Sequence, residues 1–184
     1  MAGLINQAML SRVVSHALRH EPWLYELELD SGGWVAVEQL LSALRLDRPE
    51  WADITAADLA SMIEGSSKPR HEMTGGRIRA VYGHSLPGRV SYRPEAPPAV
   101  LFHGTAPETA AVVLEKGLRP MGRQYVHLSV DGEMAMRVGA RKSSAPVVLM
   151  VNAAEAWRDG VAFYQASDHV WLADHVPAAY LSRT

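Results

Sequence analysis

The stretch Gly122-Arg123-Gln124-Tyr125-Val126-His127-Leu128-Ser129 combines a short strand with a basic lead-in and an unusual number of polar side chains. A second stretch, Phe102-His103-Gly104-Thr105, also places His and hydroxyl groups at the end of an expected strand. Such groups fill a core poorly, because buried polar atoms need hydrogen-bond partners. They are well suited to lining a pocket. The sequence therefore predicts a polar pocket at these strand ends, to which the rest of the chain delivers cations.

Composition limits the class of protein. The chain has 184 residues, of which 48% are hydrophobic and 21% charged, as is usual for one globular domain or two small ones. Cysteine is absent, which excludes disulfides and thiolate chemistry and leaves only His and carboxylates for any zinc site. A net charge of -2 argues against bulk electrostatic binding of long nucleic acid, but it is compatible with a local basic cleft.

The sequence contains no apolar run that approaches a membrane span, so we expect no membrane association. The N-terminus lacks the basic lead and apolar block of a signal peptide. The expected location is therefore the cytoplasm.

The first half predicts a helix, a short strand, two helices and a hairpin. Its first helix ends before Pro22, so Arg19 and His20 fall in the last turn, where cations complement the helix dipole. Residues 26–30 are expected to form the short strand, and Trp34 is expected in the core. This order of elements is similar to a winged helix. The remaining expected elements are a helix through Val37, Leu40 and Leu44, a helix from Thr55 capped by Asp58, and a hairpin over residues 70–82 turning at Thr74-Gly75-Gly76.

Positive charge gathers around the hairpin at Lys68, Arg70, Arg77 and Arg79. Arg77 and Arg79 share one face of a strand, which would either contact nucleic acid or face solvent. The proline-rich residues 93–98 then predict a stiff connector. We accordingly expect one domain over residues 1–93 and a second over residues 99–184.

The second half is strand-rich with interspersed helices, which is an α+β pattern. Thr105 with Glu108 predicts a capping box for a helix that ends at Gly117, and Ser129 is expected to cap the next helix. The expected strands are residues 100–102, 126–128, 147–151 (central), 160–164 and 170–173, followed by a closing turn over residues 177–181.

Several catalytic motifs are absent: the glycine-rich dinucleotide fingerprint, the phosphate-binding loop with its lysine, the nucleophile elbow and the paired-histidine zinc helix. His16 and His20 have metal-ligand spacing but no third ligand, so no metal is expected. Many Arg, several His and no protein nucleophile suit a reaction in which the substrate is the nucleophile. The protein would then neutralise phosphate charge, a task that suits the Arg fork.

The order of the motifs resembles one known family over nearly the whole chain. The sequence is similar to the NAD-dependent RNA 2′-phosphotransferases of the KptA type. In the first half the likeness rests on Ser15, Leu18-Arg19-His20, Pro22, Leu29-Asp30, Gly33-Trp34-Val35, Leu40-Leu41, Lys68, Arg70, Glu72, residues 76–80 and residues 82–85. In the second half it rests on His103-Gly104-Thr105, Gly117-Leu118, residues 121–129, residues 147–149, Phe163-Tyr164, residues 170–172 and Val176-Pro177.

The resemblance implies an N-terminal winged-helix-like RNA lobe and a C-terminal lobe like an ADP-ribosyltransferase, which binds NAD without the usual fingerprint. It also implies a reaction in two steps. The RNA 2′-phosphate attacks the nicotinamide ribose and expels nicotinamide, and the adjacent ribose hydroxyl then attacks phosphorus. The products are an RNA 2′-hydroxyl and ADP-ribose 1″,2″-cyclic phosphate.

By the same resemblance, residues take specific roles. The catalytic group is Arg19, His20, Arg70 and Arg123, with His20 exchanging a proton in the second step. The residues expected to bind NAD are His103, Gly104 and Thr105 on the adenosine side and Tyr125, His127 and Ser129 near the nicotinamide ribose. Those expected to bind RNA are Lys68, Arg77, Arg79, His84 and Ser85. No metal is needed, and Arg123 is expected to face Arg19, His20 and Arg70 across a cleft.

Simpler structural roles compete with these assignments. His103 and His127 are equally suited to a structural role with satisfied ring nitrogens, and Tyr125 and Trp171 to core packing. Two positions depart from the family pattern. His71 stands where Phe or Tyr commonly follows the catalytic Arg, and Asp168-His169 replaces the more usual Asn-Gly.

Other functions share the same first step. An ADP-ribosyltransferase acting on a nucleic-acid terminal phosphate or another phosphorylated acceptor is the main alternative, and a non-enzymatic RNA-binding module is a further one. The expected partners are NAD and a 2′-phosphorylated RNA, such as a tRNA splice junction. The chain is expected to act as a monomer.

Overall fold

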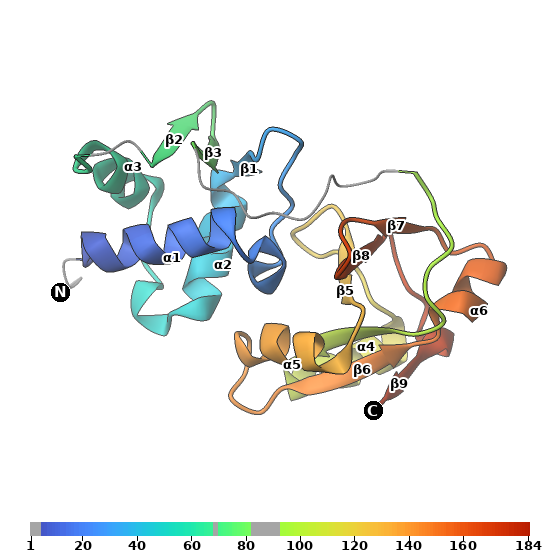
Figure 1. Cartoon of the computed structure of the whole chain (residues 1–184). Helices are drawn as coiled ribbons and strands as arrows, with labels where there is room; N and C mark the ends of the chain where they lie inside the picture. Colours follow the sequence, from blue (N-terminus) through green and yellow to red (C-terminus); the bar gives the residue numbers. More distant parts are fainter. Residues whose placement is uncertain (1–4, 68–69, 82–92) are drawn as a thin grey trace. The chain divides into compact units, whose positions relative to one another are not determined.

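The computed structural model describes residues 5–67, 70–81 and 93–184 (Figure 1). The chain divides into two compact units, Met1–Leu86 and Pro87–Thr184, each of which is described by itself. Lys68, His84 and Ser85, which were expected to contact RNA, lie outside the described residues. Each unit has its own antiparallel sheet, so the expectation of mixed helices and strands is confirmed.

The first unit groups its helices beside a small sheet (Figure 1). The sheet has three strands in the order β1-β3-β2. In chain order the elements are α1 (Gln7–Arg19), the 3-10 helix η1 (Pro22–Tyr25), β1 (Val35–Ala36), α2 (Val37–Asp47), the 3-10 helix η2 (Pro49–Trp51), α3 (Ala56–Glu64), β2 (His71–Thr74) and β3 (Arg77–Ala80).

Apolar spacing and capping explain these helices. The Asn6 side chain accepts a hydrogen bond from the Met9 backbone N–H at 3.0 Å and so begins α1. At the start of α3 the Asp58 carboxylate accepts from the Thr55 backbone N–H at 2.8 Å, as the predicted cap requires. The buried apolar residues of α1, α2 and α3 are Leu10, Val14, Ala17, Leu18, Val37, Leu40, Leu41, Leu44, Leu59 and Met62.

The hairpin is confirmed. Gly75 and Gly76 join β2 to β3 with φ angles of 55° and 73°, which L-residues with a side chain rarely adopt. Side chains alternate along β3: Ile78 is buried, whereas Arg77 is exposed and Arg79 half-buried. The two arginines therefore share one face, as predicted.

The expected strand over residues 26–30 is wrong. Leu27 and Leu29 are buried, but the segment joins no sheet, and the strand lies instead at β1, which pairs with β3. Glu26 has a φ of 51°, which turns the backbone out of an extended path. The Asp30 carboxylate then accepts hydrogen bonds from nearby backbone N–H groups, which favours a turn over a strand.

The second unit is built on a six-stranded sheet in the order β7-β8-β5-β4-β6-β9. Its strands β5, β7 and β8 are steeply inclined to β6 and β9 (Figure 1). In chain order the elements are β4 (Leu101–Thr105), α4 (Pro107–Lys116), β5 (Val126–Ser129), α5 (Gly132–Ala140), β6 (Val147–Val151), α6 (Ala153–Arg158), β7 (Phe163–Gln165), β8 (Val170–Ala173), the 3-10 helix η3 (Ala178–Tyr180) and β9 (Leu181–Arg183).

Both N-terminal helix caps predicted in the second half are wrong, whereas Gly117 ends α4 as predicted. Thr105 and Ser129 are buried in β4 and β5, so their side chains belong to the sheet. Helix α4 begins at Pro107, whose fixed φ suits a first helical turn. Helix α5 is capped by Asp131, which accepts from the Met134 backbone N–H at 2.7 Å.

Two strand boundaries also differ from expectation. Strand β7 starts at Phe163 because Gly160 has a φ of 97° and belongs to the preceding turn. After the predicted closing turn the chain continues into β9, which pairs with β6 and places β6 inside the sheet. Trp171 is buried in the core of this unit, as expected. Among the described residues, no helix is both long and apolar enough to cross a membrane.

Helix α5 crosses β4 at Gly104 with the two backbones in contact. A Cβ atom on Gly104 would lie 1.7 Å from the Ala135 carbonyl oxygen and 2.9 Å from the Gly139 nitrogen. On the helix, a Cβ on Gly139 would lie 3.1 Å from the Thr105 nitrogen. The pair of glycines therefore permits the close packing of α5 on the strand that carries His103 and Thr105.

This crossing predicts that Gly104→Ala destabilises the protein, because the obstacle is backbone that must move. We expect a loss of about 3 kcal/mol or more in the free energy of unfolding, the upper end for overpacking. Gly132→Ala in α5 is the matched control, since its Cβ would meet only Phe102 Cδ1 at 3.9 Å. We expect that control to change stability by less than about 1 kcal/mol. Denaturant unfolding of both variants measures the difference, and equal stabilities would contradict the crossing.

Candidate functional site

The candidate cofactor residues gather where β4 meets β5. These strands pair through Phe102 and Ser129, whereas β4 pairs with β6 along its whole length from Leu101 to Thr105. Next to the β4–β5 pair, His103 Nδ1 lies 2.9 Å from the His127 carbonyl oxygen. The His103 side chain thus provides the hydrogen-bond partner of the His127 carbonyl oxygen where the two strands meet.

This hydrogen bond determines the tautomer of His103. A carbonyl oxygen only accepts, so Nδ1 carries the proton. In the neutral ring Nε2 is then an acceptor, which suits a hydroxyl group. The bond serves a structural role equally well, and it orients the imidazole in either case.

The structure brings most of the expected NAD residues together. His103 and Thr105 lie on β4, His127 and Ser129 lie on β5, and all are buried. Gly104 lies on the same strand, where it makes the backbone contact with α5. The Lys142 ammonium also reaches the Gly104 carbonyl oxygen at 3.4 Å. Buried polar side chains on two adjacent strands are costly in a purely structural core, so they indicate a functional site.

Tyr125 belongs to a second polar group that spacing did not reveal. It is half-buried and contacts Tyr164 edge to face, with ring centroids 5.5 Å apart. Tyr164 in turn donates a hydrogen bond to Asp174 Oδ2 at 2.8 Å. This bond, followed by burial and the carboxylate charge, raises the pKa of Tyr164 and keeps the phenol protonated. Tyr164 and Asp174 lie far from Tyr125 in sequence, so only the fold unites them.

Arg123 lies in a tight turn before β5. Its backbone N–H donates to the Pro120 carbonyl oxygen at 3.2 Å, and Met121 within the turn has a φ of 57°. The Arg123 side chain is half-buried. The turn therefore fixes the backbone from which the candidate catalytic guanidinium extends.

In the first unit, two candidate catalytic residues come together. Arg19, the last residue of α1, donates from Nη2 to the Arg70 carbonyl oxygen at 3.1 Å. His20 is the C-cap of the same helix, and its side chain is exposed. The end of α1 is thereby fixed to the start of the hairpin, with His20 next to the contact.

His16 contacts two residues of the segment that follows α1. Its Nε2 lies 2.9 Å from Glu21 Oε2 and its Nδ1 lies 3.0 Å from Tyr25 Oη. Both ring nitrogens are therefore engaged with protein groups, which does not favour metal ligation together with His20. In the part of the chain that the structure describes, no three His, Asp or Glu side chains gather as metal ligands.

His71 fastens the hairpin to α1. It is buried, and its Nε2 lies 3.1 Å from Ser15 Oγ. Burial first, and then the positive charges of Arg19 and Arg70, lower the pKa of His71 from 6.5 to about 4. The ring is neutral at physiological pH, so this departure from the family pattern adds no charge beside Arg70.

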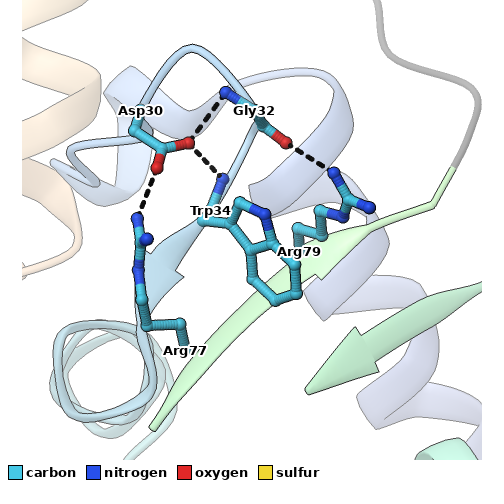
Figure 2. A network of polar contacts seen from close by, with 5 residues as sticks. All are labelled: Asp30, Gly32, Trp34, Arg77 and Arg79. Atoms are coloured by element: carbon cyan, nitrogen blue, oxygen red, sulfur yellow. Dashed lines mark hydrogen bonds and ion pairs between the residues drawn. The ribbon is translucent and has the colours of Figure 1, made fainter. Parts of the chain in front are cut away.

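Asp30 organises a polar network on the face of the small sheet (Figure 2). Its Oδ1 accepts hydrogen bonds from the backbone N–H groups of Gly32 at 2.8 Å and Trp34 at 3.0 Å, and its Oδ2 pairs with Arg77 Nη2 at 2.5 Å. Burial acts to raise its pKa, but the hydrogen bonds from Arg77, Trp34 and Gly32 hold the pKa of Asp30 below its ordinary value.

Arg79 and Trp34 complete the network. Arg79 pairs with Glu72 and donates from Nη1 to the Gly32 carbonyl oxygen at 3.3 Å. The Arg79 and Arg77 guanidinium carbons lie 4.6 and 5.9 Å from the centroid of the Trp34 ring. The expectation that Trp34 belongs to the core is wrong: it is half-buried, because it lies beside Arg79 on the polar face of the sheet.

The second departure from the family pattern lies in the turn between β7 and β8. Asp168 and His169 are exposed there. The Ser167 hydroxyl oxygen accepts from the backbone N–H groups of His169 and Val170 at 3.2 and 3.1 Å. Ser167 therefore organises this turn, in which the Asp168 side chain is exposed.

Comparison with known proteins gives a consistent result across both units. The model of the family described as RNA 2′-phosphotransferase, Tpt1 / KptA family, matches residues 6–175. A relative from Acetivibrio thermocellus, named a probable RNA 2′-phosphotransferase, is 51% identical and covers 97% of each chain. A relative of the same name from Bacillus thuringiensis subsp. konkukian is 49% identical, over 94% of this chain and 93% of its own. In Archaeoglobus fulgidus, a probable RNA 2′-phosphotransferase 1 is 37% identical, over 95% of this chain and 79% of its own.

The depressed pKa of His71 predicts a pH dependence of stability. Between about pH 6.5 and about pH 4 the unfolded chain binds this proton and the folded chain does not. The free energy of unfolding therefore falls as the pH falls through this window, by at most about 3 kcal/mol from this residue. His71→Phe keeps an aromatic ring without a titrating proton, so its stability should fall less over the same window. Denaturant unfolding across this range compares the two proteins, and parallel curves would show that His71 is not held neutral.

Proposed function

The chain belongs to the RNA 2′-phosphotransferase, Tpt1 / KptA family, and from this premise we propose that it transfers an internal 2′-phosphate from RNA to NAD. The resemblance predicted from the sequence motifs is thereby confirmed. The proposed products are RNA with a 2′-hydroxyl, nicotinamide and ADP-ribose 1″,2″-cyclic phosphate. The proposed substrate is a 2′-phosphorylated RNA, of which a tRNA splice junction is one example.

The proposed reaction has two displacements. An oxygen of the RNA 2′-phosphate bonds to C1″ of the nicotinamide ribose, and the bond from C1″ to nicotinamide breaks. The ribose 2″-hydroxyl then bonds to phosphorus, and the bond to the RNA 2′-oxygen breaks. A proton passes overall from the 2″-hydroxyl to the RNA 2′-oxygen, and His20 is the proposed group that exchanges it.

The Arg19–Arg70 contact is the observation that carries the proposal. The Arg19 guanidinium bonds to the Arg70 backbone, and after burial the positive charges of both arginines lower the pKa of His71, so both cations act at one place. A phosphate bound there would be attracted by both positive charges, and Arg is suited to grip it with paired N–H donors. These cations would also stabilise charge on the transferring phosphoryl group, so no metal is required.

We assign NAD to the second unit. The His103 ring, which the bond from Nδ1 to the His127 carbonyl oxygen orients, is the proposed contact to a ribose of NAD. Thr105, His127 and Ser129 supply further polar groups nearby, and Arg123 is the proposed cation of this unit. The role of Gly104 is to admit α5, which keeps β4 in place beneath the cofactor.

The unit architectures support the same assignment. The order α1-β1-α2-α3-β2-β3, with the sheet order β1-β3-β2, is a helix, a strand, two helices and a hairpin, with the strand at residues 35–36 in place of the predicted 26–30. We interpret this unit as a winged-helix-like RNA lobe. We interpret the six-stranded unit as a lobe like an ADP-ribosyltransferase, in which the short β4–β5 ladder marks the NAD side.

Product analysis tests the proposal directly. The protein is incubated with NAD and an RNA that carries one internal 2′-phosphate, in the presence of a metal chelator. We expect loss of the 2′-phosphate and formation of ADP-ribose 1″,2″-cyclic phosphate in equal amounts. An unchanged RNA would refute the proposal. Stable ADP-ribosylated RNA without cyclic phosphate would instead favour transfer of ADP-ribose to phosphate as the activity.

Two variants separate the proposed steps. Arg123→Gln should lower the rate of nicotinamide release by roughly 100-fold or more, because it removes a charge that stabilises the transition state. His20→Ala should still release nicotinamide and accumulate RNA with a phospho-ADP-ribose branch, since the second step lacks its proton carrier. Arg119→Gln, at an exposed position in the same loop, is the control and should react as the wild type does. Absence of the branched RNA in the His20 variant would remove His20 from the second step.

A further inference from the structure

The outer face of the small sheet combines cations with an aromatic ring. Arg70 and Glu72 are alternate residues of one chain segment, and Arg77 and Arg79 alternate with buried Ile78 on β3. The register pairs Glu72 with Arg79, and Trp34 precedes β1 on the other side of Arg79. Trp34, Arg79 and Glu72 therefore form a row across the sheet on the face opposite His71 and Ile78.

Two arginines of this face, Arg77 and Arg79, are poorly placed to attract phosphate by charge. Arg77 is paired with Asp30 and Arg79 with Glu72, so the formal charges of the cluster cancel. A phosphate would have to compete with two carboxylates. The sequence expectation that Arg77 and Arg79 contact RNA phosphates therefore has an electrostatic cost that Arg70 does not share.

The same ion pairs hold the guanidinium planes still. Arg79 is fixed by Glu72, by the Gly32 carbonyl oxygen and by the Trp34 ring. Figure 2 shows Trp34 between the side chains of Arg77 and Arg79, with the Asp30 carboxylate facing Arg77. The side chains of Arg77 and Arg79 remain 48% and 36% exposed, so these flat groups are ordered and accessible to solvent.

Another arginine–tryptophan contact in the same unit provides a contrast. The Arg48 guanidinium carbon lies 5.1 Å from the centroid of the Trp51 ring, a geometry similar to that of the Arg79 contact. Trp51 is only 4% exposed, so that pair contributes to packing. Trp34 differs because its ring is half-buried on a polar face, where a second guanidinium also lies beside it.

We propose that Trp34, Arg77 and Arg79 form a stacking site for a nucleobase of single-stranded RNA. Unpaired bases stack on aromatic rings and on guanidinium planes, and such stacking tolerates any base because each has a π face. The proposal rests on the proposed function for its ligand, a 2′-phosphorylated RNA. Glu72 lies two residues from Arg70, or about 7 Å along a strand. The stacked base therefore belongs to a nucleotide flanking the one whose phosphate Arg70 grips.

RNA binding without NAD tests this site independently of catalysis. The probe is a short single-stranded RNA with one internal 2′-phosphate, compared with matched RNAs in which a flanking nucleotide is abasic. We expect one abasic position to weaken binding to the wild type by roughly 5- to 100-fold. Arg79→Lys should weaken binding to the intact RNA by a similar factor and should remove the sensitivity to that abasic position. Lysine keeps the charge and loses only the plane.

Arg48→Lys is the matched control, because it removes the other arginine–tryptophan contact and should leave RNA affinity unchanged. Thermal unfolding of both variants establishes that they are folded. Wild-type affinity of Arg79→Lys, or equal binding of abasic and intact RNAs, would overturn the stacking site. Either result leaves the phosphotransfer reaction untouched, and failure of product formation leaves this binding comparison intact.

Discussion

Arg19 and Arg70 carry like charges, and the first unit nevertheless holds them together. The hydrogen bond from the Arg19 guanidinium to the Arg70 carbonyl oxygen joins the last residue of α1 to the start of the hairpin. The Ser15–His71 contact repeats the connection one helical turn earlier. Because His71 is neutral in this environment, it connects α1 to the hairpin without adding a third positive charge beside Arg19 and Arg70. Two positive charges near one place are what an anionic phosphate needs, and the fold brings both of them near His71.

The second unit differs from the first because it keeps several polar side chains buried inside its sheet. His103, Thr105, His127 and Ser129 occupy buried positions on adjacent strands. The short β4–β5 ladder gives the His103 ring room to reach the His127 carbonyl oxygen. Close packing of α5 on Gly104 holds β4 from its other face. A purely apolar strand would pack equally well, so the cost of these polar groups is consistent with a binding role.

Local sequence signals predicted most elements, and failed where two signals competed. The apolar spacing of α1 and the Gly75-Gly76 turn have one strong interpretation each, and both were predicted correctly. Thr105 and Ser129 are residue types that often cap helices, but both are buried within strands of the sheet. Pro107 and Asp131 lie at the starts of the two helices instead. The segment at Leu27 and Leu29 has the alternating pattern of a strand. It does not form one, because the positive φ of Glu26 turns the backbone and the hydrogen bonds of Asp30 favour a turn. Tyr164 and Asp174 joined the group around Tyr125 only because β5 pairs with β8, which is far away in the sequence, and no local pattern encodes that pairing.

The face of the small sheet shows why a cluster of basic residues in a sequence does not define a phosphate site. Arg70 and Arg79 are the same residue type and cannot be told apart from the sequence alone. The strand register, however, places the Glu72 carboxylate on one side of Arg79 and the Trp34 ring on the other. Its charge is then largely neutralised, while its plane becomes ordered. Arg70 instead lies near Arg19, and after burial the positive charges of these two arginines lower the pKa of His71. Cross-strand neighbours thus divide arginines of one hairpin into those that attract an anion and those that present a flat surface, and this division favours a phosphate at the first and a base at the second.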